Sequence, residues 1–183
     1  MSRAWVLVAC LSILTATGLI WAPQSASAQT AQQRDATRQR VRTALAVSGP
    51  KIGVHFQQST KNPYNFNGSK TTNLKNGDSL EIVVSVGKSN TVGFRIYPHY
   101  KGGYINLDRV QDRANFARHL LYMSDQNFLF WGVDDNNDTF CGFTFTLESG
   151  FPEAALDVVV RSIPEQDKFV GQLRPYIDGS SGL

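Results

Sequence analysis

The sequence predicts an α+β fold, in which an antiparallel sheet of five to six strands packs against an N-terminal helix, a middle helix and a kinked C-terminal helix. Residues 80–86 and 92–96 alternate between apolar and polar side chains, the period of a strand. Residues 128–147 hold two aromatic, β-favouring runs around a polar turn, as in a hairpin. Residues 32–47, 116–123 and 152–177 carry apolar residues at helical spacing instead.

The first 28 residues have the three regions of a secretory signal peptide. Arg3 is followed by an apolar stretch over residues 4–22, and an A-x-A pattern ends at Ala28. We expect cleavage after Ala28, which leaves residues 29–183 as a single periplasmic or secreted domain. The alternatives are a retained membrane anchor and a lipoprotein attached at Cys10.

The mature composition argues against several classes of function. Arg3 is the one charged residue before Gln29, so cleavage lowers the formal net charge from +3 to +2. This charge is too small to indicate a nucleic acid as partner, and no membrane span is expected after processing. Cys141 is then the single cysteine, so no internal disulfide can form. Since it lies on the apolar face of a predicted strand, we expect a buried, unreactive thiol.

The first helix is predicted over residues 32–47 and ends at Gly49-Pro50. A short strand is expected at residues 52–56. The polar stretch 59–78 is predicted to be a mobile loop, with a binding loop as the alternative. A basic stripe on the helix is interpreted as a solvated face, with an acidic docking partner as the alternative; it consists of Arg34, Arg38 and Arg42.

Turn residues at 87–90 join the next two strands into a hairpin. Pro98 cannot donate a ladder hydrogen bond, so the second strand is predicted to end there or to lie at an edge of the sheet. Asp108 or Asp112 can cap the middle helix, and Pro152 suits the first turn of the next one. Pro164 predicts the kink, and residues 162–165 have capping-box spacing.

In the 128–147 hairpin, the second run turns Cys141, Phe143 and Phe145 to one face and threonines to the other. The first run is apolar on both faces, which predicts a strand covered on both sides. The register stays open between two turns. A loop centred on Asn136 pairs Trp131 with Cys141, whereas a two-residue turn at 136–137 shifts the pairing by one and exchanges the faces.

The order of elements, the acidic turn Asp134-Asp-Asn-Asn-Asp138, the helix start Ser149-Gly-Phe-Pro-Glu153 and the long C-terminal helix resemble a YbjN-type domain. That group is similar in fold to the secretion chaperones of type III systems. The resemblance covers roughly residues 91–178, and the 59–78 stretch lies outside it. It implies a non-catalytic α+β domain that presents a sheet or helix face to other proteins.

The local sequence offers no catalytic or metal-binding motif. The acidic turn starts like an EF-hand loop but has Thr139 at the position of the glycine and Phe145 at that of the bidentate glutamate. The histidines at 55, 99 and 119 have no ligand partners at zinc spacing. We therefore predict neither enzymatic activity, cofactor nor metal. A triad assembled across the fold remains an open alternative.

The best candidate surface is rich in tyrosine, a residue type that, like arginine, is enriched at binding hot spots. We predict that it binds a protein segment by strand addition, in a chaperone-like or regulatory role; it consists of Arg95, Tyr97, His99, Tyr100 and Tyr104. Cross-strand packing is the alternative explanation. The competing function is a small-molecule-binding or hydrolytic domain with its site between the sheet and residues 59–78; an envelope-maintenance role without a discrete site and a homodimer also stay open.

The processing prediction is tested by the intact mass of the exported protein. A mass that corresponds to residues 29–183 is the expected result, because the small-residue pattern ends at Ala28. A mass that retains the first 28 residues would contradict it.

Overall fold

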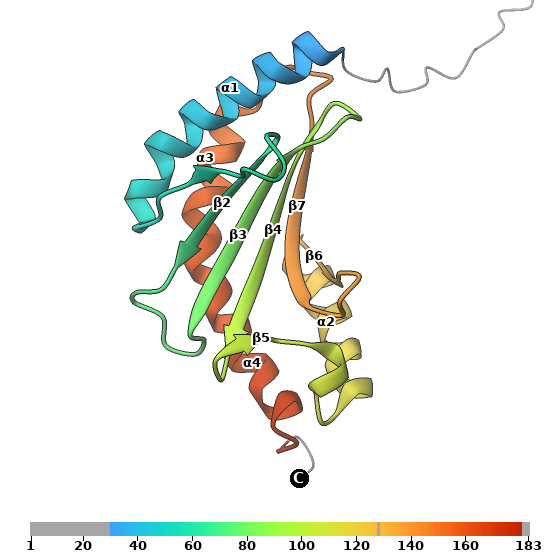
Figure 1. The fold of residues 1–183 in the computed structure, drawn as a ribbon. Helices are drawn as coiled ribbons and strands as arrows, with labels where there is room; N and C mark the ends of the chain where they lie inside the picture. The colour runs from blue at the N-terminus through green and yellow to red at the C-terminus, as the bar shows by residue number, and fades with distance from the viewer. Residues whose placement is uncertain (1–29, 128, 181–183) are drawn as a thin grey trace, which may run out of the picture.

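In the computed structural model, residues 30–127 and 129–180 are described; the predicted signal peptide and residue 128 of the hairpin lie outside this part. Within it, a seven-stranded sheet has the order β1-β2-β3-β4-β7-β6, and β5 pairs with β4 (Figure 1). The α+β class and the antiparallel sheet are confirmed. The strand count exceeds the predicted five to six because β1 and β2 were not predicted; β1 has two residues, too few for a sequence pattern, and β2 lacks apolar alternation.

The described helices are α1 (Ala31–Ser48), α2 (Arg113–Asn127), α3 (Glu153–Ser162) and α4 (Asp167–Ile177), with 3-10 turns η1 (Gly49–Ile52), η2 (Leu107–Arg109) and η3 (Ile163–Gln166). The strands are β1 (Gln57–Gln58), β2 (Asn65–Lys70), β3 (Ser79–Val86), β4 (Thr91–Tyr100), β5 (Gly103–Tyr104), β6 (Phe130–Val133) and β7 (Thr139–Thr146). Among the described residues, no helix combines the length and apolarity needed to cross a membrane.

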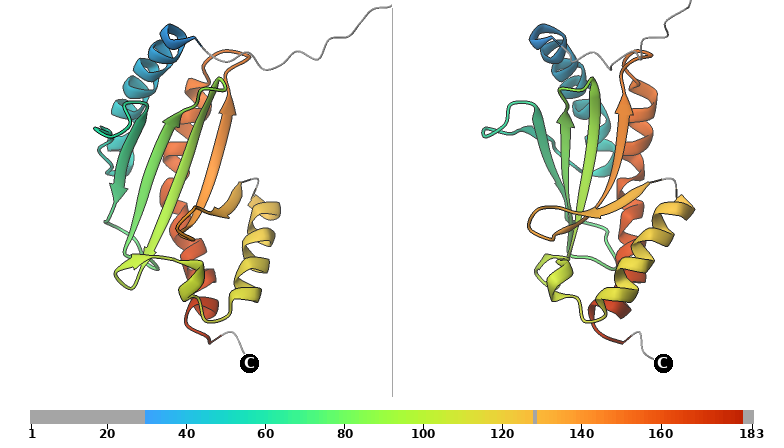
Figure 2. Two further views of the ribbon diagram at one scale, coloured as in Figure 1. Left: turned by 45° about the vertical axis from the view of Figure 1, so that its right-hand side comes forward. Right: turned by 90° about the vertical axis from the view of Figure 1, so that its right-hand side faces the viewer.

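The core lies on one face of the sheet. Alternate residues of β3 and β4 are fully buried there against apolar side chains of the helices. In Figure 1, α3 and α4 run behind the strands, and the views in Figure 2 place them on the same side of the sheet. The opposite face, which we call the open face, carries the intervening side chains of β3 and β4, and no helix of the described residues crosses it.

The predicted apolar spacing of α1 is confirmed, since Val41 and Leu45 are buried, and the Thr30–Gln33 capping box fixes the start of the helix. The α-helix ends at Ser48 with Gly49 as its C-cap, as predicted, but the chain does not leave helical geometry there. Proline is tolerated in a first helical turn, and the chain continues as η1 until Gly53 takes up a positive φ of 71°. The strand predicted at residues 52–56 is therefore wrong, and pairing begins only at β1.

The segment 59–78 is not a single long loop, because it contains β2, which pairs with β3 along six residues. The sequence pattern failed here because β2 has one large apolar anchor, Phe66. Its other inward positions are Gly68, against which Val54 and Phe56 pack, and Lys70, whose side chain is buried. A strand of small and polar residues lacks the apolar alternation by which strands are recognised.

Pro98 does not mark an edge of the sheet, and this prediction is wrong. It lies within β4, between β3 and the strands β7 and β5. The Pro98 carbonyl accepts from the Ile105 amide on the β5 side, so its missing N–H faces that side too. Pairing with β7 ends two residues earlier, at Ile96 and Cys141. Proline is tolerated because no β7 carbonyl is left there to receive a donor.

The 128–147 hairpin adopts the register with Trp131 opposite Cys141. A five-residue turn makes this register, since the Asp134 carboxylate accepts the Asn136 and Asp138 amides and Asn137 has a φ of 63°. Phe143 and Phe145 face the core and are half-buried, while Thr144 and Thr146 are exposed.

The first hairpin strand is not covered on both sides as predicted, because β6 ends the sheet and exposes Phe130 and Val133. Helix α2 lies against its outer edge, where the Trp131 amide donates to the Ser124 hydroxyl at 3.0 Å.

The predicted kink at Pro164 is confirmed as η3, but Ser162 does not act as a helix cap; its hydroxyl donates to the Val159 carbonyl. The strong contacts belong instead to Asp167, the first residue of α4. Its carboxylate accepts the backbone amides of Lys75, Asn76 and Gly77 at 2.7–3.1 Å. It thus fastens the segment between β2 and β3 to the C-terminal helix.

Burial opposes ionisation of Asp167, but the amides of Lys75, Gly77 and Asn76 and the Asn76 side chain together hold the pKa of its carboxyl below the ordinary value. Replacing it with alanine should lower the free energy of unfolding by roughly 2–4 kcal/mol, because several inward-facing donors lose a charged acceptor. Urea unfolding at pH 7 tests this, with the exposed Asp125→Ala as control.

The same site predicts a pH dependence. A carboxyl with a depressed folded pKa stabilises the fold above its unfolded pKa of about 3.9, and this contribution is lost as pH falls through the folded value. The stability difference between the wild type and Asp167→Asn should therefore shrink from pH 7 to pH 3. A difference that is constant over this range would show that the charge of Asp167 is not what holds the segment.

Candidate functional site

The open face gathers four of the five predicted site residues. Arg95, Tyr97 and His99 alternate along β4, and Tyr104 of β5 pairs with His99. Two phenylalanines from the hairpin join them, which extends the cluster from β5 across the sheet to β6. We call the five rings the aromatic ladder; they belong to His99, Tyr104, Tyr97, Phe140 and Phe130.

Neighbouring rings in the aromatic ladder are in contact throughout. Their centroids are 4.2 Å apart for His99–Tyr104, 5.9 Å for Tyr104–Tyr97, 5.5 Å for Tyr97–Phe140 and 5.9 Å for Phe140–Phe130. Tyr97 and Phe140 are buried in the middle, whereas Tyr104 is 38% and Phe130 42% exposed. The rings thus do pack across strands, as the alternative explanation held, and leave two large aromatic side chains partly exposed: Phe130 at one end and Tyr104 next to His99 at the other.

Glycines on the hairpin explain how the ladder lies flat on the sheet. Phe130 pairs with Gly142, and Gly132 pairs with Phe140. A Cβ on Gly142 would meet the Phe130 ring at 2.3 Å, and one on Gly132 would meet the Phe140 ring at 3.2 Å. Each ring therefore lies across the glycine of the opposite strand. Gly132, Phe140 and Gly142 are visible in the sequence, but only the register reveals that they share a face.

Arg95 stands beside the ladder with its guanidinium 4.5 Å from the centroid of the Phe140 ring. The side chain is exposed, and it makes no hydrogen bond or ion pair with any other residue in the described part of the chain. A cation–π contact uses none of the donors of arginine, so these stay available to a ligand.

The β5 end of the ladder is polar. Glu81 of β3 accepts the Tyr104 hydroxyl, and its carboxylate oxygen lies 3.7 Å from His99 Nε2. At that distance the histidine nitrogen has no hydrogen-bond partner among the described residues. The hydrogen bond to Glu81, followed by burial and the negative charge, raises the pKa of Tyr104 well above its ordinary value.

Tyr100, the fifth predicted residue, is not part of this surface. It lies on the helix side of β4, where its hydroxyl donates to Asp178 at 2.9 Å and accepts from Arg174 Nε at 3.1 Å. The prediction grouped it with the others by proximity in sequence, but consecutive residues of a strand point to opposite faces.

Two hollows lie on the open face. One, of about 430 Å³, we call the glycine hollow; its lining includes Gly87, Gly93, Val83, Arg95, Tyr97 and Phe130. The other, of about 330 Å³, we call the polar hollow; it lies between β1, β2, β3 and β4 and is lined by His55, Gln57, Asn67, Ser69, Glu81 and His99, among others.

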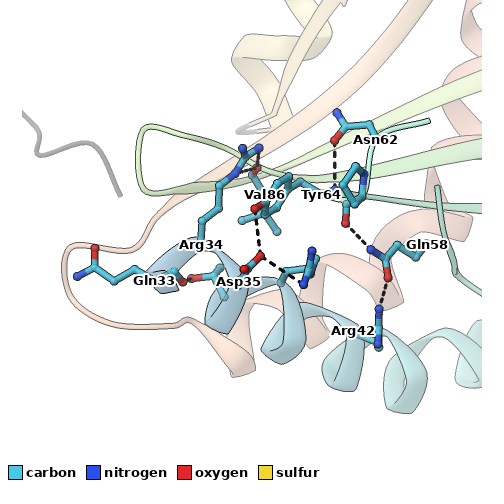
Figure 3. A network of polar contacts seen from close by, with 11 residues as sticks. Gln33, Arg34, Asp35, Arg42, Gln58, Asn62, Tyr64 and Val86 are labelled. Carbon is cyan, nitrogen blue, oxygen red and sulfur yellow. Dashed lines mark hydrogen bonds and ion pairs between the residues drawn. The ribbon is translucent and has the colours of Figure 1, made fainter. Parts of the chain in front are cut away.

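The basic stripe on α1 is not simply solvated. The Arg34 guanidinium lies 3.5 Å from the Tyr64 ring centroid and donates to the Val86 carbonyl at 2.6 Å. The Tyr64 hydroxyl donates to the Asp35 carboxylate of α1, and Arg42 donates to Gln58 (Figure 3). These contacts hold α1 against the start of β2 and the end of β3, so the arginines have a structural role.

Neither the acidic turn nor the thiol offers an alternative centre. The Asp134 side chain is occupied by the turn amides, and no group of three or more metal-ligating side chains gathers within residues 30–127 and 129–180. Cys141 is buried as predicted, with its Sγ 3.3 Å from Gln166 Oε1, and burial raises the pKa of its thiol far above the ordinary value.

No protein-family model matches the chain, and no curated protein matches it. The resemblance to YbjN-type domains therefore stays a prediction. Among solved structures, the chain is similar to one in the crystal structure of the ExsC–ExsE complex, with a TM-score of 0.45 and 8% identity. The match covers 76% of this chain and 96% of the other. This similarity concerns the fold alone.

The contact between Glu81 and Tyr104 predicts a change in titration. Replacing Glu81 with glutamine removes the charged acceptor, so the pKa of Tyr104 should fall toward the ordinary tyrosine value of about 10. An NMR titration of tyrosine ring carbons measures the shift. Glu148→Gln, which removes an exposed carboxylate elsewhere, should leave the Tyr104 curve unchanged. An equal shift in both variants would mean that overall charge, not the contact, sets this pKa.

Proposed function

We propose that this chain is an exported, non-enzymatic protein of the YbjN type, which binds a segment of another protein across the open face of its sheet. The observation that carries the proposal is the aromatic ladder on an uncovered sheet face, with an unpaired arginine beside it. Tyrosine, tryptophan and arginine are the residue types most enriched among binding hot spots.

Binding across the face replaces the strand addition expected from the sequence. β4 is hydrogen-bonded to β3 on one side and to β7 and β5 on the other, so it has no free edge over most of its length. The exposed parts of Phe130 and Tyr104 stand at opposite ends of the ladder, and a bound segment that crossed the strands could contact both. The role would be chaperone-like or regulatory.

Site-specific photo-cross-linking in envelope extract tests the face. A photoreactive amino acid at Thr144, exposed on the open face, should give a protein adduct, whereas the same group at Val158, exposed on α3, should not. Phe130→Ser combined with Tyr104→Ser should abolish the Thr144 adduct, because the two exposed rings are the proposed anchors.

The matched control is Leu121→Ser combined with Tyr122→Ser on α2, which removes two side chains that are exposed to 69% and 57%. It should leave the Thr144 adduct intact, and urea unfolding should show that both double variants are folded. Adducts at Val158 but not at Thr144 would overturn the proposal.

The polar hollow favours a second candidate, a small-molecule-binding site. It lies where β1 and β2 meet β3 and β4, close to the place expected between the sheet and residues 59–78, and polar side chains converge on it. A small-molecule screen by NMR tests this candidate. A compound that shifts the ring signals of His55 and His99, together with no cross-linking at Thr144, would favour small-molecule binding over protein binding.

A further inference from the structure

We propose that the segment bound on the open face carries a carboxylate next to an apolar side chain: Arg95 binds the carboxylate, and the glycine hollow receives the side chain. The inference rests on the proposed function and adds the chemistry of the partner.

The first observation concerns how this fold uses its arginines. Five arginines lie over aromatic rings in the described part of the chain: Arg34, Arg38, Arg40, Arg95 and Arg174. Four of them also have an oxygen partner in the chain: Arg34, Arg40 and Arg174 donate to the Val86 carbonyl, Glu153 and the Tyr100 hydroxyl, and Arg38 forms an ion pair with Asp35. Arg95 alone of the five has no such acceptor among the described residues.

Arg40 is the closest comparison. Its guanidinium lies 4.4 Å from the Phe151 ring centroid, nearly the distance of Arg95 from Phe140, and its Nη2 donates to Glu153 Oε1 at 3.0 Å. An arginine stacked in the same way is therefore paired with a carboxylate elsewhere on the surface of this protein. Guanidinium donors match a carboxylate in geometry and charge, so a carboxylate is the ligand that best completes Arg95.

The second observation is the charge of the glycine hollow. Arg95 is the one charged residue in its lining, and the remaining side chains are neutral. The nearest acidic residue along β3, Glu81, is engaged by Tyr104 at the other end of the ladder. An occupant with a negative group is thus complementary to this hollow, whereas a cationic occupant would face an uncompensated positive charge.

The third observation is the shape of the hollow. Its floor includes Gly93, where a Cβ would have Thr144 Oγ1, at 3.9 Å, as its nearest heavy atom. Phe130 and Tyr97 line it as well. Its volume of about 430 Å³ lies within the usual range for ligand sites. The neutral part of its lining is mixed, with Asn65, Ser85, Thr91 and Thr144 beside Val83, Phe94, Tyr97 and Phe130. The exposed ring of Phe130 offers contact to an apolar side chain.

The test is a selection of random eight-residue peptides displayed on phage, with the purified protein as bait. Selected peptides should be enriched in aspartate or glutamate adjacent to an aromatic or aliphatic residue. Affinities of one synthesised, fluorescein-labelled winner are then measured by anisotropy. Backbone amide NMR shifts identify the face that the peptide occupies. Addition of 500 mM salt should weaken the binding of the peptide, as expected for an exposed ion pair.

Three variants separate the contributions. Arg95→Gln should weaken the winner roughly tenfold or more, because it removes the charged donor. Gly93→Leu should also abolish binding, since its side chain occupies the hollow and a Cβ at this position meets no atom closer than 3.9 Å. Arg40→Gln, the matched control, should bind like the wild type. Thermal unfolding of all three checks that the fold is kept.

The outcomes distinguish the inference from the proposed function. Winners without acidic enrichment that still shift open-face amides, or unchanged affinity in Arg95→Gln, would overturn the inference and leave protein binding on this face in place. A selection that yields no peptide for the open face, or only peptides that shift amides of the helices, would overturn both.

Discussion

In the described part of the chain, the helices bury apolar side chains against one face of the sheet, and this one-sided cover is the constraint on which the other features depend. A sheet strand presents alternate residues to its two faces, so every second side chain of β3 and β4 must be accommodated without a helix. On the β2 side, small and polar residues meet this requirement. On the hairpin side, large aromatic rings do so by lying across glycines of the neighbouring strand and against one another. The candidate site therefore arises from the way in which large side chains pack on the face that no described helix covers.

The same constraint explains why polar contacts, and not apolar packing, hold the segment between β1 and β3 against the helices. The segment from β1 to β3 has few apolar side chains to pack, so charged groups at its two ends hold it. Arg34 and Asp35 of α1 hold its start through Tyr64, and Asp167 of α4 holds its end through three backbone amides. A carboxylate that accepts several amides is a strong and directional contact. This contact holds the polar segment in place, as apolar packing holds the strands.

The sequence was sufficient wherever a single periodic pattern decides the structure. The strands around Ile82 and Phe94, the helix stripes around Leu45 and Leu120 and the kink at Pro164 all follow from local patterns. It failed where tertiary pairing decides. β2 has no pattern because Phe66 is its one large apolar anchor, and Pro98 suggested an edge although β7 simply ends before it. Tyr97, His99 and Tyr104 were found because β4 and β5 are close in sequence, whereas Phe130 and Phe140 joined them only through a register that the sequence left open.

The two ends of the sheet also carry a consequence of their own. One end strand, β1, has two residues, and the other, β6, has its outward Trp131 amide bonded to the Ser124 hydroxyl of α2. Neither end strand is itself a long row of free amides and carbonyls on which another copy of the chain could grow as an added strand. A protein that displays exposed aromatic rings on a sheet face would otherwise be prone to stack into fibrils, since fibrils need both apolar contact between sheet faces and free strand edges for pairing. By keeping its end strands short, this fold limits the edge along which such stacking could propagate.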